Sequence, residues 1–212
     1  MSTTPEPPAQ AAADMGTGLD GIAAAARREG GRGPPPVHLW NPPFCGDLDM
    51  RIASDGTWFY MGTPIGRQPL VKLFASVLKR EDERYFLVTP VEKCGIRVDD
   101  APFLAVEMQV ETPGGGGAPI LHFRTNVDDW VACGPEHGLR FVTDPATQGL
   151  KPYLHVRREL WAKVNRAVFY DLVELGEERM IDGVAMFGVA SMGAFFAMAP
   201  ADSLRDFVGD GA

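Results

Sequence analysis

Basic residues stand at the start of a predicted helix, where local electrostatics alone would disfavour them. Apolar side chains recur at helical spacing over residues 68–80, and Arg67 precedes this helix, with Lys72 one turn further on. The N-terminus of a helix carries a partial positive charge, so acidic side chains are preferred there. A bound anion would compensate the cations, and the pattern therefore predicts an anion-binding site.

The same pattern recurs later in the chain. A longer amphipathic helix is predicted over residues 159–175, with Arg157 and Arg158 at its start and Lys163 about a turn later. The alternative is that these cations turn away from the helix and pair with carboxylates such as Glu159 or Asp144. The sequence alone leaves both interpretations open.

Two glycine-containing motifs resemble ligand-binding or catalytic signatures but fail on context. The run Pro-Gly-Gly-Gly-Gly-Ala-Pro at residues 113–119 lies between predicted strands, whereas a phosphate-binding loop is followed by a helix. In residues 188–193 the glycine stands three positions before Ser191, where a nucleophile elbow needs two. We therefore predict a hairpin loop at the first motif and no hydrolase at the second.

The residue types that ligate metals do not occur at ligand spacing. Asp47, Asp49 and Asp55 lack the regular spacing and the closing Glu of a calcium loop. The four histidines do not form H-E-x-x-H or a similar pattern. We expect neither a metal site nor a cofactor.

The overall charge limits the classes of partner. The chain has 20 Lys and Arg against 28 Asp and Glu, a formal net charge of -8. Nucleic acids and anionic lipids require an excess of cations on one face of a protein. We therefore expect no DNA, RNA or membrane partner, which still leaves room for a local basic pocket.

The cysteines and the N-terminus favour a cytoplasmic location. The three cysteines are too far apart for a disulfide framework or a zinc knuckle, so we expect reduced thiols. The N-terminal segment has neither the basic opening nor the apolar core of a secretory signal. Residues 184–199 are apolar but shorter than the ~20 residues of a spanning helix, and we interpret them as buried strands.

Hydrophobic periods and turn residues predict an α+β protein with two compact units between two tails. Residues 1–36 are rich in Ala, Gly and Pro, so we expect a largely disordered tail whose residues 19–29 form a short helix only on docking. Residues 37–90 are predicted to form a small N-terminal α+β unit. Its elements are a hairpin with strands at 50–53 and 58–61 around Asp55-Gly56, the helix over 68–80 and a strand at 85–89.

Residues 91–199 are predicted to form a β-rich C-terminal unit with one long helix, and residues 200–212 a second tail. Alternation of apolar and polar residues is clearest at 103–111, which is typical of a half-solvated antiparallel sheet. The predicted strands are 92–98, 103–111, 120–125, 130–133, 139–142, 153–156, 184–190 and 194–198.

A weak internal repeat relates the two units. In each unit a hairpin leads into the pattern Arg-x-x-apolar-x-Lys-apolar at a helix start. The alignment places Arg67, Leu70, Lys72, Leu73 and Val77 opposite Arg158, Trp161, Lys163, Val164 and Val168. Duplication of a strand-strand-helix motif would explain it, although helical amphipathicity alone produces much of the match.

A set of segments in the first half of the chain forms a specific pattern: Trp40-Asn41-Pro42, Cys45-Gly46-Asp47-Leu48-Asp49-Met50-Arg51-Ile52, Asp55-Gly56-Thr57-Trp58-Phe59-Tyr60, Pro64-Ile65-Gly66-Arg67, Tyr85-Phe86-Leu87-Val88-Thr89-Pro90-Val91-Glu92-Lys93 and Asp99-Asp100-Ala101-Pro102-Phe103. From residue 37 to about residue 196 the sequence resembles the family catalogued as domain of unknown function 1285, found in proteobacteria.

This resemblance implies a small N-terminal unit and a larger C-terminal unit related by duplication, the latter superficially similar to pleckstrin-homology folds. It also implies a ligand site in the cleft between the units and a role in signalling. At the matching positions, the candidate lining residues are Arg67, Thr89, Glu92 and Lys93. Arg158 and Lys163 join them through the repeat.

Three functions are consistent with these observations. The leading hypothesis is a non-enzymatic binding or sensor module for a nucleotide-like, phosphate-bearing small molecule. The second is an enzyme acting on a phosphorylated metabolite, which needs an acid-base pair such as Glu92 with Lys93 or with His155. The third is a scaffold whose exposed β-rich unit recognises a protein partner of unknown identity.

Overall fold

A computed structural model describes residues 17–29 and 35–203 of the chain. These residues form two compact units. The first comprises the described residues up to Met50 together with Tyr60–Arg97, and the second comprises Arg51–Phe59 and the described residues from Val98 onward. The 50–61 hairpin is confirmed: the Ala53 amide donates to the Thr57 carbonyl, and Gly56 has a φ of 80°, which the tight turn requires.

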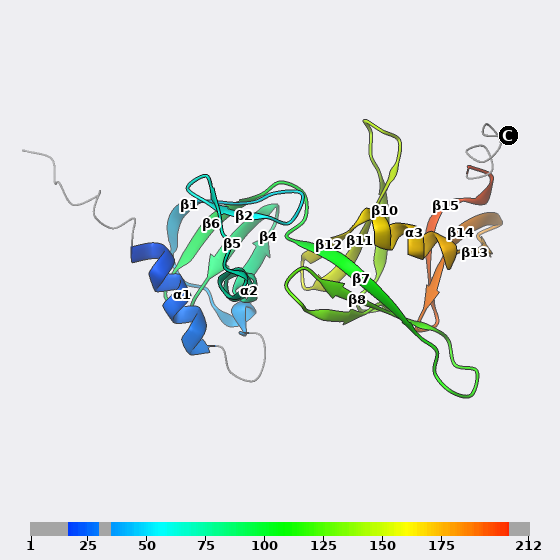
Figure 1. The fold of residues 1–212 in the computed structure, drawn as a ribbon, viewed down its shortest axis with the longest axis horizontal. Helices are drawn as coiled ribbons and strands as arrows, with labels where there is room; N and C mark the ends of the chain where they lie inside the picture. Colours follow the sequence, from blue (N-terminus) through cyan, green and yellow to red (C-terminus); the bar gives the residue numbers. More distant parts are fainter. Residues whose placement is uncertain (1–16, 30–34, 204–212) are drawn as a thin grey trace, which may run out of the picture. The chain divides into compact units, whose positions relative to one another are not determined.

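A six-stranded sheet, most of whose residues belong to the first unit, has the strand order β3-β2-β1-β6-β5-β4 (Figure 1). The bounds are β1 (Phe44–Ile52), β2 (Trp58–Tyr60), β3 (Thr63–Pro64), β4 (Leu78–Glu81), β5 (Arg84–Val88) and β6 (Lys93–Val98). The segment 92–98, which we predicted to open the second unit, supplies β6, and β6 pairs antiparallel with β5. The first sheet therefore extends to Val98.

Two helices and one turn of 3-10 helix complete the first unit. They are α1 (Thr17–Glu29), η1 (Val37–Leu39) and α2 (Gln68–Ser76). Ile22, Ala23 and Ala26 of α1 are buried, and α1 packs against α2 (Figure 1). The short helix expected over residues 19–29 is thus present and docked on α2, while residues 1–16 and 30–34 of the expected tail lie outside the described residues.

The helix predicted over 68–80 is too long. It ends at Ser76, and the following residues form β4, in which Leu78 pairs with Leu87 and Lys79 with Phe86. The apolar residues at the end of the predicted helix are instead buried in a strand. A short apolar segment fits the helical period of 3.6 and the strand period of 2 equally well, so the sequence pattern did not distinguish them. Lys79 and Arg80 are therefore not in the last turn of a helix.

The second unit contains a six-stranded sheet in the order β10-β11-β12-β7-β8-β9 and a three-stranded sheet in the order β13-β14-β15 (Figure 1). The bounds are β7 (Phe103–Glu111), β8 (Ile120–Thr125), β9 (Trp130–Ala132), β10 (Leu139–Thr143), β11 (Leu150–Arg157), β12 (Leu160–Val164), β13 (Glu177–Ile181), β14 (Val184–Ser191) and β15 (Ala194–Pro200). Helix α3 (Arg166–Glu174) packs against β7 and β14.

The helix predicted over 159–175 is wrong in its first half. Residues 160–164 form β12, which pairs with β11, and α3 begins only after Asn165, whose side-chain oxygen caps it by accepting from the Val168 amide at 2.8 Å. Arg158 occupies the β11–β12 turn with a φ of 50°. The helix-dipole argument therefore does not apply to Arg158 or Lys163.

The repeat alignment fails for the same reason. It places α2, which contains Lys72, opposite β12, which contains Lys163. Helix and strand positions are not structurally equivalent, so the aligned residues do not correspond. Duplication at another register and the likeness to pleckstrin-homology folds stay predictions.

The outer strands and the C-terminal segment differ in detail from expectation. The strands predicted at 103–111 and 120–125 are confirmed, while β3, β4, β12 and β13 were missed. Strand β15 includes Pro200, and Ala201 is buried, so these two residues of the predicted second tail belong to the fold; residues 204–212 lie outside the described part. No helix in the described ranges has the length and apolar character needed to cross a membrane.

Candidate anion-binding face

Arg67 and Thr89, two candidates of the first unit, occupy structural positions. Arg67 is exposed at the start of α2, where its carbonyl accepts from the amides of Leu70 and Val71 and its side chain does not cap the helix. Thr89 is fully buried, and its hydroxyl accepts from the amides of Val91 and Glu92 at 3.4 and 3.2 Å. Thr89 therefore stabilises the β5–β6 turn.

Lys93 and Glu92 follow in the same turn but do not form a pair with each other. The Lys93 ammonium lies 2.8 Å from the Glu81 carboxylate and 5.0 Å from the centre of the Phe86 ring. Burial raises the pKa of the Glu92 carboxyl above its usual value. The acid-base pair that the enzyme hypothesis required is thus absent from the described residues at this turn.

His155, the other proposed acid-base partner, has both ring nitrogens occupied. Nδ1 contacts the Glu136 carbonyl at 2.8 Å, and Nε2 contacts the Arg158 carbonyl. The ring also stacks on His137 and lies 5.0 Å from the Trp161 ring. These contacts hold the His155 ring against the β11–β12 turn.

Lys163 belongs to a basic and aromatic face of the second unit. In the sheet register Arg140 lies opposite Tyr153, and Tyr153 lies opposite Lys163. Directly opposed residues point to the same side of a sheet, so three neighbouring strands present these side chains together. His155 and Trp161 form the next opposed pair on the same side. We call this set the β10–β12 face.

Arg140 is the distinctive group of the β10–β12 face. Its guanidinium carbon lies 4.1 Å from the centre of the Trp161 ring and 5.2 Å from that of Tyr153, and the residue is exposed. Within the described residues Arg140 has no carboxylate partner. The two rings orient the guanidinium and leave its N–H groups available.

The half-buried carboxylate of Asp100 connects two residues of this face, Tyr153 and Lys163. Asp100 accepts from the Tyr153 hydroxyl at 2.7 Å and from the Lys163 ammonium at 2.7 Å. Burial opposes ionisation of Asp100, but these two hydrogen bonds outweigh it and hold its pKa below the usual value. Burial and the hydrogen bond to Asp100 raise the pKa of the Tyr153 hydroxyl well above 10.0.

The charges on the β10–β12 face leave a positive excess. Lys163 pairs with Asp100, and Lys151 pairs with Asp144, each at 2.7 Å. Arg140 adds a third cation, so this face carries one net positive charge on a chain whose formal charge is -8. A local positive potential of this kind attracts anions.

The Tyr153 contacts give a pH-dependent expectation. A phenol whose folded-state pKa is raised contributes stability below its unfolded pKa of 10.0, and this contribution is lost as the pH rises above that value. In an alkaline titration followed at 295 nm, wild type and Tyr153→Phe should show the same absorbance change until the protein unfolds. A larger native-state change in wild type would contradict the buried, hydrogen-bonded phenol.

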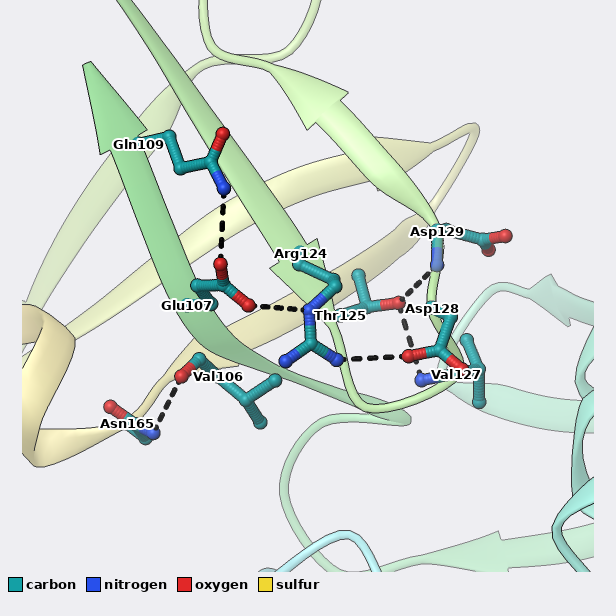
Figure 2. Close-up of polar contacts among 9 residues, drawn as sticks. All are labelled: Val106, Glu107, Gln109, Arg124, Thr125, Val127, Asp128, Asp129 and Asn165. Carbon is teal, nitrogen blue, oxygen red and sulfur yellow. Dashed lines mark hydrogen bonds and ion pairs between the residues drawn. The ribbon is translucent and has the colours of Figure 1, made fainter.

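The arginines elsewhere on this sheet have carboxylate partners. Arg124 donates to Glu107 at 2.7 Å and to Asp128 at 2.9 Å (Figure 2). Arg157, which the sequence places beside Arg158, pairs with Asp129 at 3.0 Å and lies 5.0 Å from the Phe103 ring centre. Arg157 is thus a structural cation, and the contrast with Arg140 makes the β10–β12 face the candidate site.

Sequence reasoning missed Arg140, Tyr153 and Asp100. Arg140 and Tyr153 lie in strands that were predicted, and their alternation with buried Leu139 and Leu154 could have placed them on the outer side. Their contact across strands depends on the register, which the sequence did not specify. Asp100 lies outside the predicted strands, and no sequence signal linked it to Lys163.

Family models match almost the whole described chain. Residues 35–101 match the DUF1285 N-terminal domain, described as a domain of unknown function, and residues 102–198 match the C-terminal domain of the same family. The chain belongs to the DUF1285 family. The resemblance inferred from sequence segments is thereby confirmed, and the boundary between the two family domains falls between Ala101 and Pro102.

Two solved structures of DUF1285 family proteins are similar to this chain. The protein from Silicibacter pomeroyi DSS-3 is 52% identical, with a TM-score of 0.77, and the match covers 87% of this chain and 97% of that one. The protein from Shewanella baltica OS155 is 32% identical, with a TM-score of 0.47, covering 60% and 91% respectively. A search of curated proteins finds no match.

Proposed function

We propose that this DUF1285 protein is a binding or sensor module for a phosphate-bearing, nucleotide-like small molecule. The observation that carries the proposal is Arg140, an exposed guanidinium oriented by the Trp161 and Tyr153 rings without a carboxylate partner in the described residues. A guanidinium presents its donors in a planar fork that matches phosphate oxygens, and its preorganisation reduces the entropy lost on binding.

The neighbouring cations support an anionic ligand. Lys151 on β11 and Lys163 on β12 extend the positive charge from Arg140 across the neighbouring strands, although each also has a carboxylate partner. The carboxylates fix the lysine ammonium groups in position, and a phosphate needs only the remaining donors of each. An anion on this face would therefore bind to groups that are already ordered.

The planar part of a nucleotide-like ligand also has a complement. One side of the Arg140 guanidinium faces the Trp161 ring, and the exposure of Arg140 leaves the other side accessible. Guanidinium planes stack on aromatic rings, so a base could continue the stack while its phosphate accepts hydrogen bonds. This arrangement favours a nucleotide over a simple inorganic anion.

The candidates of the first unit stay predictions. Ligand contact by Arg67 and Glu92 remains a proposal. Thr89 and Lys93 already have hydrogen-bond or ion-pair partners within the protein, and a ligand would have to share them. We also propose a cytoplasmic location and a role in signalling.

The experiment is a thermal-shift titration with pyrophosphate, AMP and ATP. Binding to the folded state should raise its stability by about 2.7 kcal/mol at a hundredfold excess over Kd. We expect the shift in wild type, its loss in Arg140→Ala and its retention in Arg166→Ala. Arg166 is a matched control because it is also exposed and also lies over a tyrosine ring, that of Tyr170, on α3.

The other outcomes decide between the alternatives. A shift that persists in Arg140→Ala and disappears in Arg67→Ala would move the site to the first unit. Turnover of a bound probe would establish an enzyme. No shift with any of the probes would contradict the proposed function and favour the scaffold hypothesis.

A further inference from the structure

A hollow lies on the half of this sheet formed by β7, β8 and β9. It has a volume of about 450 Å³ and is lined by Gln109, Val110, Glu111, His122 and Trp130. Gln109 lies opposite His122 in the register, and Trp130 lies opposite Arg124, so the three strands present these side chains together. We call this hollow the Trp130 groove.

The Trp130 ring is exposed, and its faces have no aromatic or cationic neighbour among the described residues. Trp130 is 48% exposed, and within the described residues no ring stacks on it and no cation lies over it. Trp161, by contrast, is covered by Arg140. An indole face is the strongest π acceptor for cations among the side chains.

The cation closest in register cannot cover this ring. Arg124 lies opposite Trp130, but its guanidinium is bonded to Glu107 on one side and to Asp128 on the other (Figure 2). Gln109 donates to the second oxygen of Glu107 at 3.1 Å, which holds this carboxylate in place. The native contacts therefore keep Arg124 away from the indole face.

The groove and its rim carry an excess of negative charge. Glu111 lines the groove, and Glu107 and Asp128 stand beside it as the two carboxylates bonded to Arg124, so three carboxylates face one arginine. Glu111 is bonded to His122 through Oε2 at 2.8 Å, and in the described residues nothing bonds its Oε1. An acceptor oxygen is therefore available on the wall of the groove.

We propose that the Trp130 groove binds a small organic cation with an ammonium or guanidinium group. The indole of Trp130 faces the charged group, and the free oxygen of Glu111 attracts it from the side. The volume lies in the range of about 300 to 1,000 Å³ that is usual for small-molecule sites. This site is separate from the β10–β12 face. It would bind a cation, whereas the β10–β12 face is proposed to bind an anion.

The test compares choline with its neutral isostere 3,3-dimethylbutan-1-ol, and agmatine serves as a guanidinium probe. Binding is followed through the indole N–H signal of Trp130 in two-dimensional ¹H-¹⁵N NMR spectra. We expect both cations to shift this signal in a saturable way and the neutral isostere to leave it unchanged. Binding should weaken as salt is added, because exposed charges are screened.

Substitutions inside and outside the Trp130 groove localise the binding. Glu111→Gln should weaken choline binding by about tenfold, because it removes a negative charge and keeps the shape. Trp130→Ala, followed through another tryptophan signal or by calorimetry, should abolish binding, whereas Tyr170→Ala removes an exposed aromatic ring elsewhere and should have no effect. Arg140→Ala should also leave choline binding intact, so failure of the proposed function is distinguishable from failure here.

Either of two results with wild type would overturn the proposal, and so would one result with a variant. One is equal affinity for choline and the neutral alcohol, which would show an apolar groove without cation selectivity. The other is the absence of a saturable shift for both cations at millimolar concentration. Full binding by Trp130→Ala would equally exclude this groove.

Discussion

Replacing Gly188 with Ala should destabilise the second unit by about 3 kcal/mol, at the upper end of the range for overpacking. Gly188 is buried where β14 pairs with β15, next to an irregularity in the register. A Cβ atom there would lie 2.3 Å from the Phe196 carbonyl oxygen and 2.9 Å from the Ala197 Cα. Both are backbone atoms of a paired strand, so they cannot move aside as the end of a flexible side chain can.

Urea unfolding followed by tryptophan fluorescence measures this effect. Gly114→Ala is the matched control, because it makes the same chemical change in the same unit with no atom within 4 Å of the new Cβ. We expect the control to stay within about 0.5 kcal/mol of wild type. Equal stability of the two variants would mean that β14 and β15 are not packed as described.

Ser191→Ala should cost about 2 to 4 kcal/mol, because it leaves two buried backbone groups without partners. Ser191 is fully buried, and its hydroxyl accepts from the Leu121 amide at 2.9 Å and donates to the Cys133 carbonyl at 2.7 Å. This one side chain connects β14 of the three-stranded sheet to β8 and to the residue after β9. Its loss therefore affects the junction of the two sheets.

Hydrogen exchange at the Leu121 amide gives a local readout of the same variant. This amide should exchange faster in Ser191→Ala, while amides of the first-unit sheet, such as that of Leu87, should keep their rates. Ser54→Ala, an exposed serine in the β1–β2 turn, serves as the control and should stay near wild-type stability. Unchanged exchange at Leu121 would contradict the bridging role of Ser191.

The sequence around Ser191 excluded one function but did not predict the contacts of this residue. The spacing of glycines around Ser191 excluded a nucleophile elbow, and the structure places this residue on a strand with its hydroxyl engaged by two backbone groups. The sequence held no indication that the partners would be Leu121 and Cys133, which lie 70 and 58 positions away. Such long-range hydrogen bonds depend on which strands become neighbours.

Helix and strand assignments failed where a short apolar segment satisfied two periods. The residues around Trp161 and Val164 matched a helical face, yet they alternate equally well as β12. The Asn165 cap, which marks the true start of α3, was present in the sequence but lay inside the predicted helix. The error mattered for function, because it suggested a helix dipole at Arg158 and Lys163.

The candidate site therefore differs in its structural basis from the predicted one. Lys163 remains a candidate, but its neighbours are Arg140, Tyr153 and Asp100, and its environment is a sheet face. Of the six predicted residues, Thr89 and Lys93 are engaged by turn and ion-pair contacts within the first unit.

By itself the sequence determined the family, the α+β class, most strands of the second unit and the hairpin at Asp55-Gly56, because these depend on local alternation and turn chemistry. Only the tertiary structure decided which side chains share a face. Strand order and register place Arg140 on Trp161, leave Trp130 uncovered and engage Arg124 with two carboxylates. These contacts join residues far apart in the chain, so no local pattern encodes them.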